Sequence, residues 1–358
     1  MSNSESENIK SIPFFYIIGR PRSGTTLLQL FFDAHPNVQI PSECMYIAHL
    51  LGHYRTVKFW TRIEIESFVH DLSNLWLFSL EKFNINKIEE ELIANSSSLT
   101  IDIVFKIVAK NYNSIYEKKE LLLLGDKNPF YSQVFGAIFN AIPNAKFILL
   151  IRDPRDNHIS LFNSRFTAPS ITYDTMYWKK AIRSVERFQQ YYPERFYILK
   201  YEDLVKETEK YVKEMCEFLG IPFLPEMLKY RERKTDDFTK VVFTNEAFFK
   251  ANHTSILEPV NTSKIDGWKT KLTKCSIKKA ERAAGIYLDK YSYVRLDKTP
   301  GIWSYLSTIP GKFLFHFMEW VSRNVVILPK SLQIKIVRNN HRVFALLWKV
   351  FVRKNKKL

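Results

Sequence analysis

A glycine-bounded loop near the start of the chain constrains the fold more than any other feature. The sequence Gly19-Arg20-Pro21-Arg22-Ser23-Gly24-Thr25-Thr26 directly follows the apolar run at residues 14–18. This order predicts a strand, a tight loop and a helix, which together direct backbone N–H groups and a helix dipole at an anion. The loop is similar to a Walker A sequence, but its Gly-Lys ending is missing and its cation has moved forward to Arg22. The loop therefore fits ATP hydrolysis poorly and favours another phosphorylated donor.

Further apolar runs at residues 121–124, 146–151 and 196–199 predict more strands, separated by helical patterns. Runs of this kind are typical of parallel strands buried on both faces. The predicted fold is therefore an α/β, doubly wound parallel sheet of the P-loop-like kind, with helices on both faces and ligands at the carboxyl ends of the strands. Three sets of residues are expected to form helical faces: Leu27, Leu30, Phe31 and Ala34; Phe130, Val134 and Ile138; and Tyr211, Met215, Phe218 and Leu219.

Residues 47–116 contain no convincing strand and predict a helical insertion. Its aromatic residues either line an acceptor cleft or simply pack in a core, and core packing is the more common outcome for any one of them. These residues are Phe59, Trp60, Phe68, Trp76 and Phe78.

The chain has a formal net charge of +16, which favours acidic partners such as nucleotides, anionic glycans or an anionic membrane surface. Nucleic acid is not expected, because zinc-finger spacing and RNP-like runs are absent from the sequence. Three well-separated cysteines suggest neither a disulfide framework nor a metal cluster. Residues 1–10 lack the pattern of a signal peptide, so the expected location is the cytoplasm.

Much of the positive charge lies at the end of the chain. Residues 296–358 contain twelve Lys or Arg and two Asp or Glu, so they carry +10 of the total. We therefore expect a P-loop-like α/β domain over residues 1–295 and a basic, aromatic-rich extension over residues 296–358. A helix over residues 335–357 would have one apolar and one basic face, which fits either peripheral contact with the inner face of a membrane or packing on the core.

A second motif follows the strand predicted at residues 146–151. Arg152 comes at its carboxyl end, Pro154 suits the start of a helix, and Ser160 falls about two turns into that helix. An Arg and a hydroxyl placed in this way can bind a terminal phosphate through charge-assisted hydrogen bonds. The structural alternative is an ion pair with a serine on the helix surface.

Together, the two motifs resemble the sulfotransferases that use 3'-phosphoadenosine 5'-phosphosulfate (PAPS). The resemblance implies that Arg22, Ser23, Gly24, Thr25 and Thr26 form the 5'-phosphosulfate loop. It also implies that Arg152 and Ser160 bind the 3'-phosphate, and that Tyr201, within Lys200-Tyr201-Glu202-Asp203-Leu204, lies near the adenine. Pro259-Val260-Asn261 and Trp268 resemble the segment that closes over the cofactor, where Ser263 and Lys264 are candidates for cofactor binding.

Within the family, the likeness is greatest to the branch of protein-tyrosine and bacterial sulfotransferases. It rests on the block that runs from Pro21 through Asp33-Ala34-His35-Pro36-Asn37 to Glu43. In that branch the residue at the position of Glu43 is the catalytic base. Asp126-Lys127-Asn128-Pro129 is similar to an element whose lysine, here Lys127, stabilises the transferring group.

The expected reaction is in-line transfer of a sulfuryl group from PAPS to a hydroxyl or amine of a glycan, lipid or small molecule, with Glu43, Arg22 and Lys127 as catalytic residues and no metal. Transfers of this type depend mainly on positioning and electrostatics. Two other functions remain open at this point. One is a nucleotide kinase or NTPase with a degenerate loop, and the other is a non-catalytic basic protein that binds membranes or polyanions.

Overall fold

The computed structural model describes residues 9–41, 43–75, 82–164, 170–232, 259–297 and 301–325. The chain divides into two compact units. The first comprises residues 1–151 and 184–261, and the second comprises residues 152–183 and 262–358. The boundary expected between residues 295 and 296 stays a prediction.

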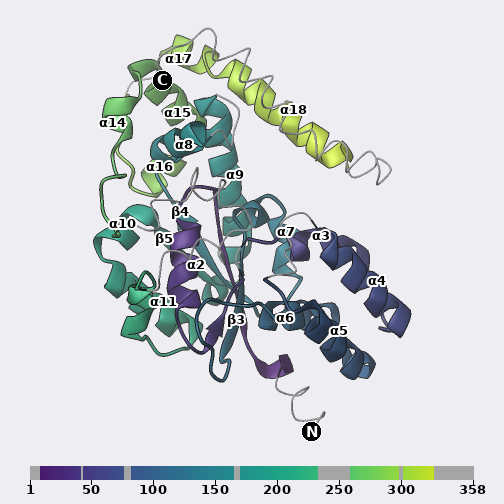
Figure 1. Cartoon of the computed structure of the whole chain (residues 1–358). Coiled ribbons are helices and arrows are strands. Elements are labelled where there is room, and N and C mark those ends of the chain that lie inside the picture. Colours follow the sequence, from purple (N-terminus) through teal and green to yellow (C-terminus); the bar gives the residue numbers. More distant parts are fainter. Residues whose placement is uncertain are drawn as a thin grey trace. The chain divides into compact units, whose positions relative to one another are not determined.

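A five-stranded parallel sheet forms the centre of the first unit, in the order β2-β3-β1-β4-β5 (Figure 1). The strands are β1 (Phe14–Gly19), β2 (Val38–Gln39), β3 (Leu123–Lys127), β4 (Lys146–Ile151) and β5 (Phe196–Lys200). Every registered pair is parallel. The predicted parallel α/β sheet is therefore confirmed. All five strands end at the same edge, where sheets of this type bind ligands.

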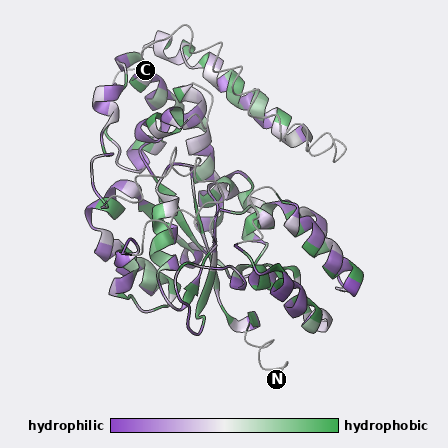
Figure 2. Ribbon diagram, viewed as in Figure 1, coloured by the Kyte–Doolittle hydropathy of each residue, from purple (hydrophilic) through white to green (hydrophobic). Residues whose placement is uncertain are grey.

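The sheet is buried on both faces, as the near-continuous apolar strands predict. On one face, Phe15 and Ile17 of β1 pack with Leu28 and Phe31 of α2 (Thr25–Asp33), and Met215 of α11 (Thr208–Leu219) belongs to the same cluster. Figure 2 shows the hydrophobic residues of these strands and of the helix sides that face them.

The opposite face of the sheet is rich in aromatic contacts. Tyr16 of β1 stacks on Phe147 of β4, and both rings lie in a cluster that continues into the short helix α7 (Phe135–Phe139). Phe188, near the end of α9 (Ile171–Gln189), completes this layer through an edge contact with Phe135. These contacts fix the central strands from both sides.

Four helices occupy most of the insertion, as predicted for the described part of residues 47–116. They are α3 (Tyr46–Tyr54), α4 (Arg62–Ser73), α5 (Ile85–Ala94) and α6 (Ile101–Lys110), with a short 3-10 turn η1 (Ser96–Ser98). Trp60 and Phe68 are buried against Tyr54, so these two aromatic residues form a core. Phe59 is 81% exposed. Trp76 and Phe78 lie outside the described residues.

Two details of the prediction from the sequence were wrong, and one strand was missed. The strand expected at residues 121–124 is β3, which starts two residues later and continues through Gly125-Asp126-Lys127. The polar side chains of Asp126 and Lys127 are buried in the structure. The two-residue strand β2 is too short to leave a pattern. The helical face expected for Phe130, Val134 and Ile138 does not form. The reason is that η2 (Pro129–Gln133) is a 3-10 helix and α7 begins only at Phe135. As a result, Phe130 and Val134 are exposed.

The remaining elements of the first unit are short except for α11. They are η3 (Pro193–Arg195), α10 (Tyr201–Lys206) and η4 (Pro225–Lys229). The α11 helix, with Met215 and Leu219 buried, confirms the third predicted helical face. Gly220 ends this helix in a left-handed conformation with φ 82°, where glycine is favoured.

The second unit is helical over the residues that the structure describes. It contains α8 (Pro154–Asn163), the first part of α9, α14 (Trp268–Lys271), α15 (Lys274–Ala284), α16 (Tyr287–Lys290), α17 (Ile302–Leu306) and α18 (Ile309–Val325). Ile159, Trp268 and Ile277 belong to its core. None of the described helices is both long and apolar enough to cross a bilayer. The helix expected over residues 335–357 lies outside the described residues.

Candidate active site

The loop between β1 and α2 has the backbone geometry of an anion site. Arg22 and Gly24 both have positive φ, 69° and 95°, and the Ser23 amide donates to the Arg20 carbonyl at 3.1 Å. Helix α2 has no acidic residue in its first turn and no side chain capping its start. The amides of its first turn are therefore outside the helix's own hydrogen bonds and at the positive end of its dipole.

Gly24 is required at its position for two reasons. Its φ of 95° lies in the left-handed region, which residues with a side chain rarely adopt. A Cβ atom there would also lie 2.6 Å from Cδ2 of Tyr201, the first residue of α10. The loop and the Tyr201 ring are thus in direct contact. This places Tyr201, largely buried, beside the loop, and a role for it in cofactor binding stays a prediction.

Lys127 connects residues that are far apart in the sequence. Its Nζ lies 3.1 Å from Oε1 of Glu43 and donates to Oγ1 of Thr26 at 3.3 Å. The lysine ends β3, Glu43 precedes α3, and Thr26 is in the first turn of α2. The Lys127 side chain is buried, whereas the Glu43 side chain is 31% exposed. Two predicted catalytic residues therefore meet beside the glycine-bounded loop, with the carboxylate on the accessible side.

Asp126 lies on the opposite face of β3 from Lys127, because side chains alternate along a strand. It is fully buried, and its Oδ2 accepts a hydrogen bond from the Tyr131 hydroxyl at 2.5 Å. Its Oδ1 has no partner among the described residues. Burial raises the pKa of Asp126 to about 7, and the hydrogen bond from Tyr131 opposes that rise. The carboxyl is therefore partly protonated near neutral pH.

The second predicted phosphate motif lies in the second unit. Arg152 follows β4 directly, and Pro154 begins α8 as expected, so that Ser160 falls within that helix. The Arg152 Nη2 donates to the backbone carbonyl of Lys264 at 2.9 Å. The contact of Lys264 with Arg152 thus involves its main chain, and the side chains of Ser263 and Lys264 are exposed.

Asp156, in the first turn of α8, holds the segment that follows Lys264. Its Oδ1 accepts from the Trp268 amide at 2.8 Å. Burial raises the pKa of this carboxyl to about 6, and the backbone hydrogen bonds lower it. The sequence offered no signal for this role, because Asp156 and Trp268 are 112 residues apart. Arg152 and Asp156 together fasten residues 264–268 to the start of α8.

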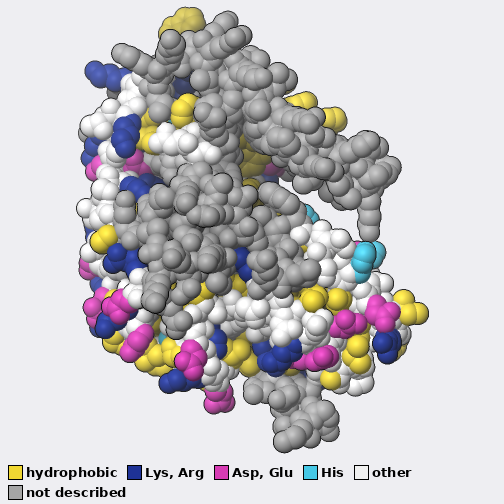
Figure 3. Space-filling model, in the orientation of Figure 1, with side chains coloured by type: hydrophobic (Ala, Val, Ile, Leu, Met, Phe, Trp, Pro, Cys, Tyr) yellow, Lys and Arg dark blue, Asp and Glu magenta, His cyan; other side chains and the backbone are white. Residues whose placement is uncertain are grey.

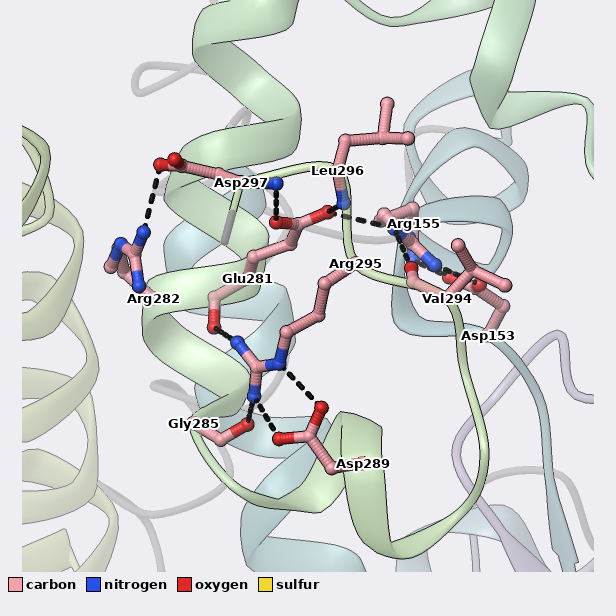
Figure 4. Close-up of polar contacts among 10 residues, drawn as sticks. All are labelled: Asp153, Arg155, Glu281, Arg282, Gly285, Asp289, Val294, Arg295, Leu296 and Asp297. Atoms are coloured by element: carbon pink, nitrogen blue, oxygen red, sulfur yellow. Dashed lines mark hydrogen bonds and ion pairs between the residues drawn. The ribbon is translucent and has the colours of Figure 1, made fainter. Parts of the chain in front are cut away.

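A buried ionic network lies next to this segment (Figure 4). Arg155 pairs with Asp153 at 2.7 Å and with Glu281 of α15 at 3.0 Å, and its guanidinium lies 3.5 Å from the centre of the Trp268 ring. Glu281 also accepts hydrogen bonds from the amides of Leu296 and Asp297. All these charges are paired, which compensates the cost of burying them. The network fixes α8, α15 and residues 294–297 to one another.

Two histidines near the motifs have structural roles. Nε2 of His35 lies 3.0 Å from the Pro222 carbonyl, and its Nδ1 accepts from the Asn37 amide. Nδ1 of His158 lies 2.6 Å from Oδ2 of Asp174. Both rings are buried.

A parallel sheet of this order, with a glycine-bounded loop between its central strand and a helix, defines a P-loop-like α/β protein. The model of the sulfotransferase family matches residues 13–225, which hold the sheet, the loop, Glu43, Lys127 and the Arg152 motif. The chain therefore belongs to the sulfotransferase family, a family of enzymes.

Several characterised proteins are similar to this chain. Protein-tyrosine sulfotransferase 1 of Danio rerio is 24% identical over 269 residues, which cover 74% of this chain and 67% of that protein. Protein-tyrosine sulfotransferase of Drosophila melanogaster is 25% identical over 229 residues, which cover 62% of this chain and 41% of the fly protein.

Two solved structures share the fold. The sulfotransferase domain from the curacin biosynthetic pathway has a TM-score of 0.50 and 22% identity, and covers 79% of this chain and 99% of that domain. The sulfotransferase domain from the Synechococcus PCC 7002 olefin synthase has a TM-score of 0.51 and 20% identity, and covers 79% of this chain and 95% of that domain.

Proposed function

We propose that this protein transfers a sulfuryl group from PAPS to a hydroxyl or amine of an acceptor. The observation that carries the proposal is the position of Lys127, whose ammonium contacts both Glu43 and Thr26. A cation, a carboxylate and an anion-binding loop are the three elements that sulfuryl transfer needs within a few ångströms of one another.

On the donor side, the amides at the start of α2 bind the 5'-phosphate, and Arg22 neutralises the oxygens of the transferring group. This assignment rests on the positive φ values of the loop and on the dipole of α2. Arg152 and Ser160 bind the 3'-phosphate. Tyr201, Ser263 and Lys264 complete the donor site in this proposal, on the strength of the family resemblance.

In the transfer step, the acceptor oxygen forms a bond to sulfur while the bond between sulfur and the 5'-phosphate oxygen breaks. The proton of the acceptor hydroxyl passes to Glu43, and the electron pair of the broken bond stays on the phosphate. Lys127 stabilises the negative charge that develops there. The Lys127–Glu43 pair also holds the carboxylate oriented toward the accessible side.

The acceptor is a hydroxyl or amine of a glycan, lipid or small molecule, and a tyrosine hydroxyl belongs in the same test because similar proteins are named for it. Helices α3 to α6 follow Glu43 in the chain, so this layer is the proposed source of acceptor specificity. In this layer, the exposed Phe59 can contact an acceptor, whereas Trp60 and Phe68 are buried against each other.

A nucleotide kinase or NTPase is the less favoured function. Such an enzyme would place a magnesium-binding carboxylate at the end of a strand beside the loop strand, which is the position of Asp126 on β3. Asp126 is instead fully buried and bonded to Tyr131, and its pKa is raised to about 7. A partly protonated, enclosed carboxyl is a poor magnesium ligand, which adds to the missing Gly-Lys of the loop.

The decisive experiment replaces Glu43 with Gln and measures transfer from PAPS to a panel of hydroxyl and amine acceptors. Loss of the general base should lower kcat by about 100- to 10,000-fold. Binding of 3',5'-bisphosphoadenosine, followed by calorimetry, should change little, because Glu43 acts on the acceptor. Lys127→Met should instead weaken both transfer and nucleotide binding.

Glu207→Gln is a control outside the helical layer formed by α3 to α6. Glu207 forms an ion pair with Lys210 at 3.0 Å, directly before the start of α11. Its replacement removes an ion pair of the same type without touching the proposed site, so transfer should persist. Unchanged transfer by Glu43→Gln would refute the proposed base, and tight binding of Mg·ATP without affinity for 3',5'-bisphosphoadenosine would refute the proposed donor.

A further inference from the structure

Helix α18 carries an exposed row of large apolar side chains, which we call the aromatic stripe. It consists of Ile309, Phe313, Phe317 and Trp320. The spacing of four, four and three residues places all of them on one side of the helix. Phe313 is 71% and Trp320 is 61% exposed. The neighbouring rings contact each other, with centroids 6.3–6.4 Å apart.

The stripe is not the side by which α18 packs on its own unit. That side is formed by Leu314, Phe315 and Met318, which lie against Tyr173 and Tyr177 of α9. An ion pair between Glu319 and Lys180 at 2.5 Å supports the same contact. Helix α18 thus has two apolar sides, and only one of them is covered by the described residues.

The short helix α17, directly before α18 in the chain, carries further exposed apolar side chains. Ile302 and Trp303 are both at least 70% exposed. The neighbouring rings of the aromatic stripe touch one another, whereas the exposed apolar residues of ordinary surfaces, such as Phe59 in the first unit, are scattered singly. Contiguous apolar surface of this kind marks a site of interaction.

The charges around the stripe identify the kind of partner. Residues 302–325 contain a single acidic residue, Glu319, which is paired with Lys180. The chain then continues for 33 residues, 326–358, with nine Lys or Arg and no Asp or Glu. By contrast, acidic and basic side chains are interspersed over the described surface of the face in Figure 3. An apolar stripe followed directly by a strongly cationic segment is complementary to an anionic lipid surface.

We propose that α17 and α18 dock this protein on an anionic membrane, with the aromatic stripe inserted at the level of the lipid headgroups. The helix lies in the plane of the interface, because its 17 residues are too few and too polar to span a bilayer. Tryptophan and phenylalanine supply the inserted apolar surface, and the cations after residue 325 attract the acidic lipids. This inference does not depend on the proposed transfer reaction.

The test uses the full chain and sedimentation with vesicles of phosphatidylcholine containing phosphatidylserine. A Phe313→Ser/Phe317→Ser variant should bind these vesicles at least about tenfold more weakly, which corresponds to ~1.4 kcal/mol. Tyr191→Ser is the control, since it removes an aromatic side chain of the first unit that is 72% exposed and should leave binding unchanged. Pure phosphatidylcholine vesicles should bind the wild-type protein more weakly than the anionic vesicles.

Three results would overturn the proposal. The first is equal vesicle binding by the wild type and the stripe variant. The second is conversion of a dimer to a monomer by the stripe variant without a change in vesicle binding, which would identify a second copy of the chain as the partner. The third is a lower unfolding temperature of the stripe variant with unchanged vesicle binding, which would mean that the chain's own tail covers the stripe.

Discussion

Replacing Asp126 with Asn tests the electrostatics beneath the candidate active site. Asp126 is fully buried next to Lys127, and burial raises its pKa to about 7. The negative charge of Glu43 contributes to the rise, while the Tyr131 hydroxyl opposes it. An asparagine has nearly the same shape, can still accept from the Tyr131 hydroxyl, and does not titrate. The substitution therefore removes the buried charge with little change in packing.

The sign of the effect follows from the direction of the pKa change. Because the folded-state pKa lies above the unfolded value of about 3.9, the native state holds the proton more tightly than the unfolded state. The contribution of Asp126 to stability is thus fully present below pH ~4 and is lost as the pH rises to about 7. The full loss is roughly 4 kcal/mol, of which about 2–3 kcal/mol falls between pH 5 and pH 8.

The assay is urea-induced unfolding of the wild type and Asp126→Asn at pH 5 and pH 8. The free energy of unfolding of the variant, relative to the wild type, should be higher at pH 8 than at pH 5 by about 2–3 kcal/mol. In the Tyr131→Phe variant, the loss of stability with rising pH should occur at higher pH than in the wild type. The substitution removes a hydrogen bond that lowers the Asp126 pKa. A difference between wild type and Asp126→Asn that is the same at both pH values would refute the reasoning.

Two other substitutions test the loop and the buried ionic network. Gly24→Ala combines left-handed backbone strain with a clash against Tyr201. In calorimetry it should weaken 3',5'-bisphosphoadenosine binding and lower the free energy of unfolding by about 1–3 kcal/mol. Gly52→Ala should be neutral or stabilising, because a Cβ atom at Gly52 would have no neighbour within 4 Å. Arg155→Lys should lower the free energy of unfolding by about 3–5 kcal/mol, since a lysine cannot make its paired and stacked contacts. Arg62→Lys, in an exposed pair, should leave the free energy of unfolding almost unchanged. Equal effects of the two arginine variants would contradict this view of the network.

The strands that the sequence predicted correctly are those with uninterrupted apolar residues. The side chains of residues 14–18, 146–151 and 196–199 pack on both faces of the sheet. Each segment is therefore an apolar run that can be recognised from the local sequence. The third strand was misplaced because its second half is Gly125-Asp126-Lys127, whose burial depends on partners such as Tyr131. The helix expected around Phe130 failed because a 3-10 turn at Pro129 changed which residues face inward.

The candidate site was predicted only in part, because local features leave a pattern in the sequence and long-range contacts do not. The glycine loop is a local motif, since its conformation and the dipole of α2 are set by adjacent residues. The Asp156–Trp268 hydrogen bond and the contact of Tyr201 with Gly24 left no trace in the sequence, because each joins residues more than a hundred positions apart. The exposed side of α18 was likewise invisible, since hydrophobicity alone does not tell which apolar side is covered.

The sequence by itself determined three features of this protein: a glycine-bounded loop with Arg22 in place of the usual lysine, strands that form a parallel α/β sheet, and a cationic stretch over residues 326–358. These properties depend on residue type and short-range spacing. Only the tertiary structure decided that Lys127 meets Glu43 and Thr26, and that Asp126 is enclosed beneath them. The physical reason is that parallel pairing brings the ends of β1 and β3 to one edge, where residues distant in the chain become neighbours.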